Sequence, residues 1–163
     1  MFVVKWLVIA VALIALAALL VGQLGMLQGH APDDLGVRDG RLKPPSKTPN
    51  SVTSQAGLYP DHPMRRHADI APLPLAGDGP ATMARIQTIV EGMPGARVVK
   101  IEPGYLYAQF TTRLMRYVDD TEFWFDPVAH VIQVRSASRV GSGDFGVNRE
   151  RIESVRSQLL AAR

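Results

Sequence analysis

The chain has 163 residues and a net charge of +3, and charged residues of both signs are spread along the sequence. This length suffices for one domain and an anchor, and the mixed charge gives little support to nucleic-acid binding. The sequence contains no cysteine, which excludes disulfides, thiol nucleophiles and thiolate metal sites but leaves the cellular compartment open.

An apolar run occupies the N-terminal part of the chain. It is unbroken from Trp6 to Val21 and, with one interruption at Gln23, extends to Leu27. About 22 residues in a helix span about 33 Å, which matches the roughly 30 Å hydrocarbon core of a bilayer. Residues 1–27 are therefore predicted to form one transmembrane anchor.

The charges on the two sides of this run predict its orientation. Lys5 precedes the run, whereas Asp33 and Asp34 follow it before the next basic residue, Arg38. Basic residues close to a membrane span remain on the cytoplasmic side. We therefore predict a single-pass inner-membrane protein whose N-terminus is cytoplasmic and whose domain lies in the periplasm.

A cleaved signal peptide is the alternative interpretation of the same run. It requires small residues at a cleavage site directly after the apolar stretch. Ala15 and Ala17 are small, but more apolar sequence follows them. Ala31 is followed by Pro32, and peptidases cut poorly before proline. The sequence therefore favours a retained signal anchor.

The next stretch, residues 28–57, is rich in Gly, Pro, Asp, Ser and Lys and shows no hydrophobic period. It is predicted to be an irregular extended segment or linker that could be laid over the domain. The α+β domain itself is expected over residues 58–163. Prolines remain frequent in its first part, where Ala68 to Leu75 could form an edge strand, since such strands tolerate proline.

Regular structure is predicted from Pro80 onward, a residue that suits the first turn of a helix. Met83, Ile86 and Val90 follow at helical spacing and form one apolar stripe. Gly92 lies where this helix is expected to end.

Two hairpins are predicted to follow this helix. Arg97–Glu102 and Tyr105–Thr112 flank a Pro-Gly turn, and Thr121–Asp126 and Val131–Ser138 flank a second turn. The last helix is expected to begin with Asn148 as its N-cap. Tight hairpins favour antiparallel pairing, and two amphipathic helices can cover one face of such a sheet. The predicted fold class is α+β: a two-layer sandwich of an antiparallel sheet of four to five strands with two helices, preceded by one transmembrane helix.

The familiar enzyme motifs are absent from the sequence. It has no Walker loop, no dinucleotide-binding fingerprint and no nucleophile elbow. His62 and His67 do not have the spacing of a metal site, and a solvated loop is the favoured interpretation of both. We therefore expect neither a metal site nor a cofactor.

Asp119 and Asp120 stand together before a predicted strand. Paired carboxylates can share a proton, bind a cation or perform acid–base chemistry. Adjacent residues of a strand point to opposite faces, however, so these two carboxylates would not normally face each other. A turn cap with an ion pair to a nearby arginine is the favoured interpretation.

The densest polar segment runs from Arg135 to Arg151. In one interpretation, arginine side chains and the N-terminus of the last helix hold an anion such as a carboxylate or phosphate. In the other, which is favoured because it needs no ligand, the arginines pair with nearby aspartates and lock the sheet to the helix. Arg135 and Arg139, four residues apart, are predicted to project to one face. The candidate ligand-binding residues are Asn50, Arg113, Asp119, Asp120, Arg135, Ser138, Arg139, Asp144, Asn148 and Arg149.

Three blocks of the sequence resemble the family catalogued as domain of unknown function 1499, over about residues 35–160. The blocks are PSKTPNSVTSQ (45–55), FTTRLMRYVDDTEFWFDP (110–127) and VIQVRSASRVGSGDFGVNRERIE (131–153). The resemblance implies a protein that is often membrane-anchored or exported and that has no established activity.

The first block departs from the family pattern. Many members of this family carry two cysteines there, where this chain has Pro45 and Ser51. The loss of both implies a dispensable disulfide and argues against a thiol mechanism in the family. The turn that contains Asn50 is either a loop pinned to the sheet or one wall of a pocket whose other walls carry Arg113 and Arg139.

The sequence favours a non-catalytic function for the domain: a binding or structural module of the cell envelope, attached to the membrane by its N-terminal helix, with an envelope protein as a possible partner. One alternative is a hydrolase or other enzyme that uses Asp119, Asp120, Arg135 and Arg139. Another is the binding of a small anionic ligand or a lipid, and a lipid would need an apolar cavity between sheet and helices.

Overall fold

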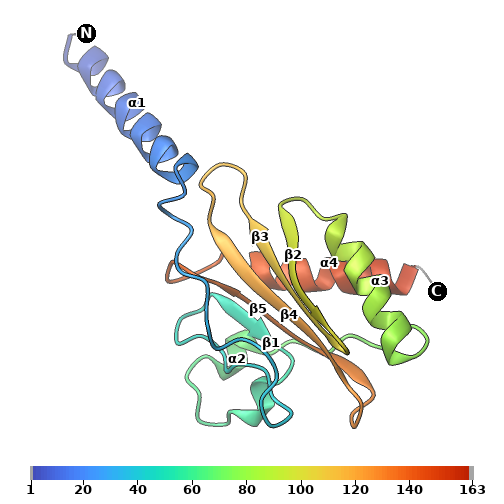
Figure 1. The fold of residues 1–163 in the computed structure, drawn as a ribbon. Helices are drawn as coiled ribbons and strands as arrows, with labels where there is room; N and C mark the ends of the chain where they lie inside the picture. The colour runs from blue at the N-terminus through green and yellow to red at the C-terminus, as the bar shows by residue number, and fades with distance from the viewer. Residues whose placement is uncertain (1, 162–163) are drawn as a thin grey trace.

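The computed structural model describes residues 2–161, which form an N-terminal helix followed by an α+β domain (Figure 1). The helices are α1 (Phe2–Gln23), α2 (Arg65–Ala68), α3 (Gly79–Glu91) and α4 (Val147–Ala161), and a single 3-10 turn, η1, spans Ala56–Leu58. The strands are β1 (Ser51–Thr53), β2 (Ala96–Glu102), β3 (Tyr105–Thr111), β4 (Val118–Asp126) and β5 (Val131–Ser138).

The strands form one antiparallel sheet in the order β1-β5-β4-β3-β2. The two predicted hairpins are present as β2–β3 and β4–β5, and the fold class is confirmed. β4 begins at Val118, so Asp119 and Asp120 lie inside the strand rather than before it. They stand opposite Ser138 and Ala137 of β5.

The fifth strand, β1, lies within the stretch expected to be irregular, and this part of the expectation was wrong. Val52 pairs with Ser136 at the outer edge of β5. All three residues of β1 are buried, but Ser51 and Thr53 are polar. Because the strand is short and buries polar side chains, it has no apolar alternation that the sequence could reveal.

The edge strand expected over residues 68–75 was also wrong. The segment starts with the last residue of the short helix α2, and Leu73 makes only an isolated bridge with Ile132. Pro72 and Pro74 flank Leu73 and have no N–H to donate, so a continuous ladder cannot form there.

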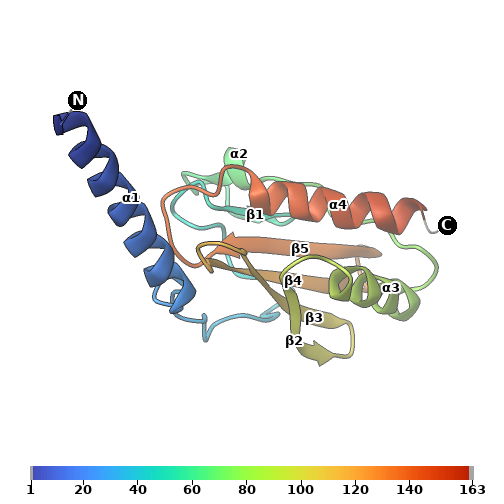
Figure 2. The same cartoon turned by 90° about the horizontal axis from the view of Figure 1, so that it is seen from above.

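α3 and α4 pack against one face of the sheet, α4 beside β5 and β1, and α3 beside β3 and β2 (Figure 2). The alternation of β4 places Phe123 on this face, where it is fully buried together with Ile86 of α3 and Ile152 of α4. α3 begins as its sequence predicts, because the Asp78 carboxylate accepts a hydrogen bond from Ala81 N at 2.7 Å.

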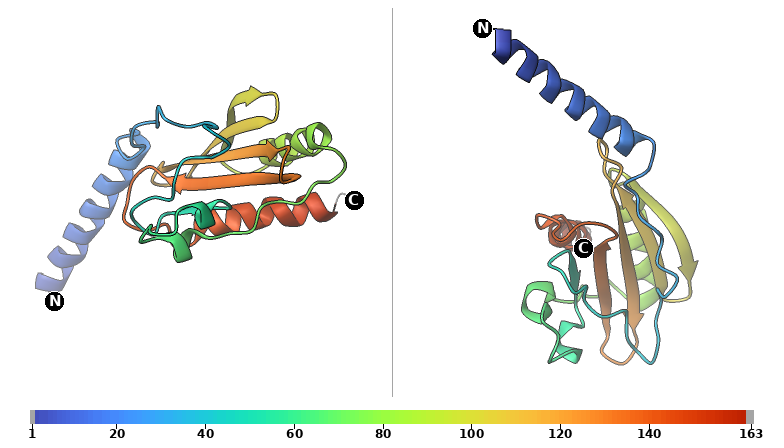
Figure 3. Two further views of the ribbon diagram at one scale, coloured as in Figure 1. Left: turned by 90° about the horizontal axis from the view of Figure 1, so that it is seen from below. Right: turned by 90° about the vertical axis from the view of Figure 1, so that its left-hand side faces the viewer.

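The other face of the sheet is covered by the chain that connects α1 to β1 (Figure 3). Leu42 of this connection is 1% exposed and packs with Tyr105 and Tyr107 of β3. Gly36 N donates a hydrogen bond to Glu122 Oε1 at 2.7 Å. The connecting segment is therefore a wall of the domain and not a free linker.

α1 extends away from the domain (Figure 1). Its side chains are exposed along its length, and it is the one helix among residues 2–161 that is long and apolar enough to cross a membrane. Gly22 near its C-terminal end is buried, because the β3–β4 loop lies against it.

Candidate functional site

Two separate polar networks lie on the two faces of β4 and β5. They are separate because neighbouring residues of a strand point in opposite directions. Asp119 faces the helices and pairs with Arg151, whereas Asp120 faces the connecting segment and pairs with Arg139. The two aspartates therefore do not form one acid–base pair, and each already has its own arginine.

The network on the helix face is centred on Arg151, a residue that sequence reasoning left out of the candidate set. Its Nη2 donates to Asp119 Oδ2 at 2.6 Å. Its Nη1 donates to Ser136 Oγ at 2.9 Å and to Asn148 Oδ1 at 2.7 Å. The guanidinium also lies 4.4 Å from the ring centroid of Phe110. A buried arginine with this many partners fixes α4 to the sheet.

Helical spacing could have identified Arg151. It lies three residues after Asn148 and four before Val155, and both of those residues are buried against the sheet. Residues at such offsets share one helix face, so Arg151 belongs to the buried face of α4 and cannot point to solvent.

Asn148 is not the N-cap of α4, because the helix begins at Val147. The Asp144 carboxylate instead accepts hydrogen bonds from Gly146 N at 3.0 Å and from Asn148 N at 3.3 Å. Burial raises the pKa of Asp144, but these hydrogen bonds and one from the Asn148 side chain outweigh it and leave the pKa below its ordinary value. Asp144 therefore serves the helix terminus and forms no ion pair with an arginine among residues 2–161.

The Asn148 side chain instead lies in the buried network and is fully buried. It donates to Asn50 O at 3.2 Å and to Ser138 Oγ at 3.0 Å. Asn50 in turn donates to Gly141 O at 2.9 Å, so the loop before β1 is pinned to the loop after β5. The pinned-loop interpretation of Asn50 agrees with these contacts.

On the opposite face, Arg139 binds Asp120 with both arms of its guanidinium. Nε donates to Oδ2 at 2.8 Å and Nη2 to Oδ1 at 2.7 Å, and the Tyr107 hydroxyl donates to the same carboxylate. The hydrogen bonds to Asp120 raise the pKa of Arg139. Asp120 is 1% exposed, so its charge is compensated by these partners rather than by water.

Arg135 lies on the same face as Arg139, as their four-residue spacing predicts. It is 4% exposed, and its Nε donates to Pro44 O at 3.2 Å. Its Nη1 lies 3.9 Å from Glu122 Oε2, which is beyond hydrogen-bond distance. Burial lowers the pKa of Arg135, although Glu122 acts in the opposite direction. Among residues 2–161, the terminal nitrogens of Arg135 therefore have an ionic neighbour but no hydrogen-bond acceptor.

Glu122 is, after Arg151, the second residue of these polar networks that the sequence did not single out. It is fully buried, and its Oε1 accepts hydrogen bonds from Gly36 N and from the Tyr105 hydroxyl at 2.8 Å. Its Oε2 has no hydrogen-bond partner in the described part of the chain. Burial raises the pKa of Glu122. Burial also raises the pKa of Tyr105, and the neighbouring Glu122 carboxylate raises it further. Only the register of β4 against β5, which places Glu122 opposite Arg135, could have identified this pair.

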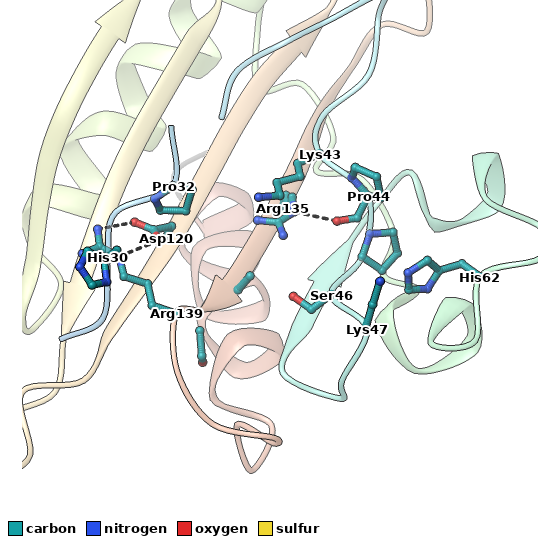
Figure 4. Close-up of a pocket in the computed structure, with 13 residues that line it drawn as sticks. His30, Pro32, Lys43, Pro44, Ser46, Lys47, His62, Asp120, Arg135 and Arg139 are labelled. Atoms are coloured by element: carbon teal, nitrogen blue, oxygen red, sulfur yellow. Dashed lines mark hydrogen bonds and ion pairs between the residues drawn. The ribbon is translucent and has the colours of Figure 1, made fainter. Parts of the chain in front are cut away.

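A cavity of about 560 Å³ opens between the connecting segment and the end of β5 (Figure 4). Its walls contain one carboxylate, Asp120, which is already bound to Arg139. The basic residues that line it are Lys43, Lys47, Arg135, Arg139, His30 and His62. His62, expected in a solvated loop, is therefore part of a wall of this cavity. Two of its four Lys and Arg side chains, Lys43 and Arg139, already have carboxylate partners, so Lys47 and Arg135 are the cations that could meet an anion there.

The remaining candidate residues lie in different places. Ser138 lines the cavity. Arg149 donates to the carbonyl oxygens of His67 and Asp69 at 2.7 and 2.8 Å, and so holds the segment after α2. Arg113 does not line this cavity and lies in the β3–β4 loop beside the end of α1. Within residues 2–161 no three His, Asp or Glu side chains come together as metal ligands.

A scan against family models matches residues 41–159 to DUF1499, described as a protein of unknown function. This match covers most of the chain and includes both polar networks and the sheet that carries them. A search of curated proteins gives no match. The chain therefore belongs to the DUF1499 family.

Proposed function

We propose that this DUF1499 protein is a membrane-anchored, non-catalytic module of the cell envelope that binds a small anionic ligand in its basic cavity. The proposal rests mainly on the surroundings of Arg135. Its side chain is 5% exposed where it lines the cavity, and its terminal nitrogens reach no hydrogen-bond acceptor among residues 2–161. A buried cation normally has such acceptors, and a carboxylate or phosphate in the cavity would supply them.

Of the other three Lys and Arg side chains that line the cavity, only Lys47 has no carboxylate partner in the described part of the chain. Lys43 has Asp34 as its partner at 2.5 Å, and Arg139 has Asp120. Lys47 is exposed and has no ion pair in the described part of the chain, so its ammonium group is available to a ligand. Lysine and arginine together suit a phosphate or carboxylate, the first as a point charge and the second as a fork.

The enzyme alternative has less support. A hydrolase would need a carboxylate free to accept or deliver a proton near the reacting atoms. Asp119 and Asp120 point to opposite faces, and each carboxylate is held by an arginine. The lipid alternative requires an apolar cavity between sheet and helices. Apolar side chains fill the centre of that space, and the cavity of about 450 Å³ at its end, beside Phe110, also has the charged residues Glu150 and Arg151 in its lining.

Binding can be tested with inorganic phosphate and succinate as probes. We expect isothermal titration of the full-length protein in detergent to show saturable binding of at least one probe. Lys47→Gln should weaken this affinity severalfold, and Arg135→Lys should weaken it by tenfold or more, because lysine keeps the charge but loses the fork.

The control for this titration is Lys100→Gln. Lys100 lies on β2, the edge strand farthest from β5, is about half exposed and pairs with Glu102 at 2.9 Å. Its replacement should leave the affinity unchanged. No saturable heat with either probe at millimolar concentration, or equal loss in the control, would contradict the proposal.

The membrane half of the proposal rests on α1. Its 22 residues are apolar throughout except for Lys5 near the start and Gln23 at the end. With Lys5 on one side and Asp33 and Asp34 on the other, the positive-inside rule supports a cytoplasmic N-terminus in the inner membrane and a periplasmic domain over residues 58–163 with its covering segment. An envelope protein remains a candidate partner of that domain.

This topology predicts the behaviour of two C-terminal fusions. A phosphatase that is active only outside the cytoplasm should be active, and a fluorescent protein that folds only in the cytoplasm should be dark. The phosphatase fusion should remain in the membrane at full length after a carbonate wash. A shortened form released into the soluble fraction would instead support a cleaved signal peptide.

A further inference from the structure

The β3–β4 loop, residues 112–117, meets the C-terminal end of α1 (Figure 1). The Gln23 side-chain amide donates to Arg113 O at 3.1 Å and to Leu114 O at 2.8 Å. A Cβ atom at Gly22 would lie 2.9 Å from the Cα and carbonyl oxygen of Met115, so only glycine permits this approach. The loop therefore lies at the level where the apolar helix ends.

The side chains that this loop exposes are of two kinds. Leu114 is 65% exposed and Tyr117 is 39% exposed. Arg113 and Arg116 are exposed as well, and neither has an ion pair within residues 2–161. The loop contains no carboxylate. It thus presents an exposed leucine between two arginines, followed by a tyrosine.

We propose that the β3–β4 loop is a second membrane-contacting element that binds anionic lipid headgroups and fixes the domain against the bilayer surface. This inference rests on the anchor part of the proposed function, and it does not depend on the cavity. Leu114 enters the outer part of the acyl region, Tyr117 lies at the interface, and the two arginines contact headgroup phosphates.

Two observations identify a lipid surface as the occupant. The loop adjoins α1, because it is hydrogen-bonded to the last residue of the helix. If α1 spans the membrane, the loop therefore lies at the level of the lipid headgroups. Its composition is also that of an interfacial segment, in which arginine extends its charge toward phosphates and aromatic rings lie at the headgroup level. Leu24 and Met26, which follow α1, add exposed apolar surface beside it.

Labelling of single cysteines can test this contact, because the natural sequence has none. We place an environment-sensitive fluorophore on the full-length protein as Leu114→Cys in nanodiscs of phosphatidylcholine, with or without phosphatidylglycerol. We expect blue-shifted emission and quenching by a lipid-borne quencher, both stronger in the anionic discs. Arg113→Gln and Arg116→Gln should each lower the ratio of docked to free loop by about fivefold in anionic discs.

Two further labels separate the failure of this inference from failure of the anchor. Val128→Cys, in the turn at the other end of β4 and 89% exposed, should report water in every disc. Leu16→Cys within α1 should report lipid. A lipid signal at position 16 with a water signal at position 114 overturns the loop contact alone. A signal at position 114 that changes neither with lipid charge nor with the arginine substitutions also overturns it. A water signal at position 16 overturns the anchor and the loop contact together.

Discussion

Replacement of Arg151 by alanine is expected to lower the free energy of unfolding by about 3–5 kcal/mol. The change leaves the buried Asp119 carboxylate without its cation and removes the hydrogen bonds to Ser136 and Asn148. It also removes the contact of the guanidinium with the Phe110 ring. Because these groups are buried or border only a small cavity, water replaces the lost partners incompletely.

The measurement is urea unfolding of the full-length protein in mild detergent, followed by Trp124 fluorescence in a Trp6→Phe background. Lys100→Ala is the matched control, since Lys100 pairs with Glu102 at 2.9 Å while both side chains are about half exposed. That control should cost less than about 1 kcal/mol. A similar small loss for Arg151→Ala would show that the helix-face network does not hold α4 to the sheet.

Replacement of Arg139 by alanine is expected to cost about 2–4 kcal/mol in the same assay. Asp120 is buried, and Arg139 is the cation that binds both of its oxygens. Arg139 also lines the basic cavity, so this variant distinguishes a structural ion pair from a residue reserved for a ligand. A functional residue can be lost without a loss of stability, because functional clusters are often strained rather than stabilising.

Asp120→Asn provides the control background for this variant. In that background Arg139→Ala no longer leaves a buried negative charge without its cation. The loss in free energy of unfolding should therefore be clearly smaller than in the wild type. If Arg139→Ala is as stable as the wild type, or more stable, the structural role of the pair is wrong. The pair would then belong to the anion site, together with Arg135.

The sheet strands and the two long helices could be predicted because their signals are local. Phe123 and Phe125 occupy alternate positions in β4, with Glu122, Trp124 and Asp126 on the other face, and Met83, Ile86 and Val90 recur at helical spacing in α3. β1 could not be predicted, since a three-residue strand with buried polar side chains gives no period.

The candidate site was predicted only in part. The opposite orientation of Asp119 and Asp120 follows from strand geometry alone, and so does the shared face of Arg135 and Arg139. Strand geometry alone does not predict which arginine pairs with each aspartate. It depends on the register of β4 against β5 and on the docking of α4, which select Arg151 for one aspartate and Arg139 for the other.

The sequence by itself determined the apolar N-terminal helix, the α+β class and the basic, cysteine-free character of this DUF1499 protein. These properties depend on composition and on short-range periodicity. Only the tertiary structure decided that residues 28–50 form one wall of a cavity, that Arg135 is buried behind Pro44, and that the β3–β4 loop lies at the end of α1. Each of these contacts joins residues that lie far apart in sequence, and a local pattern carries no information about which distant residue packing will bring into reach.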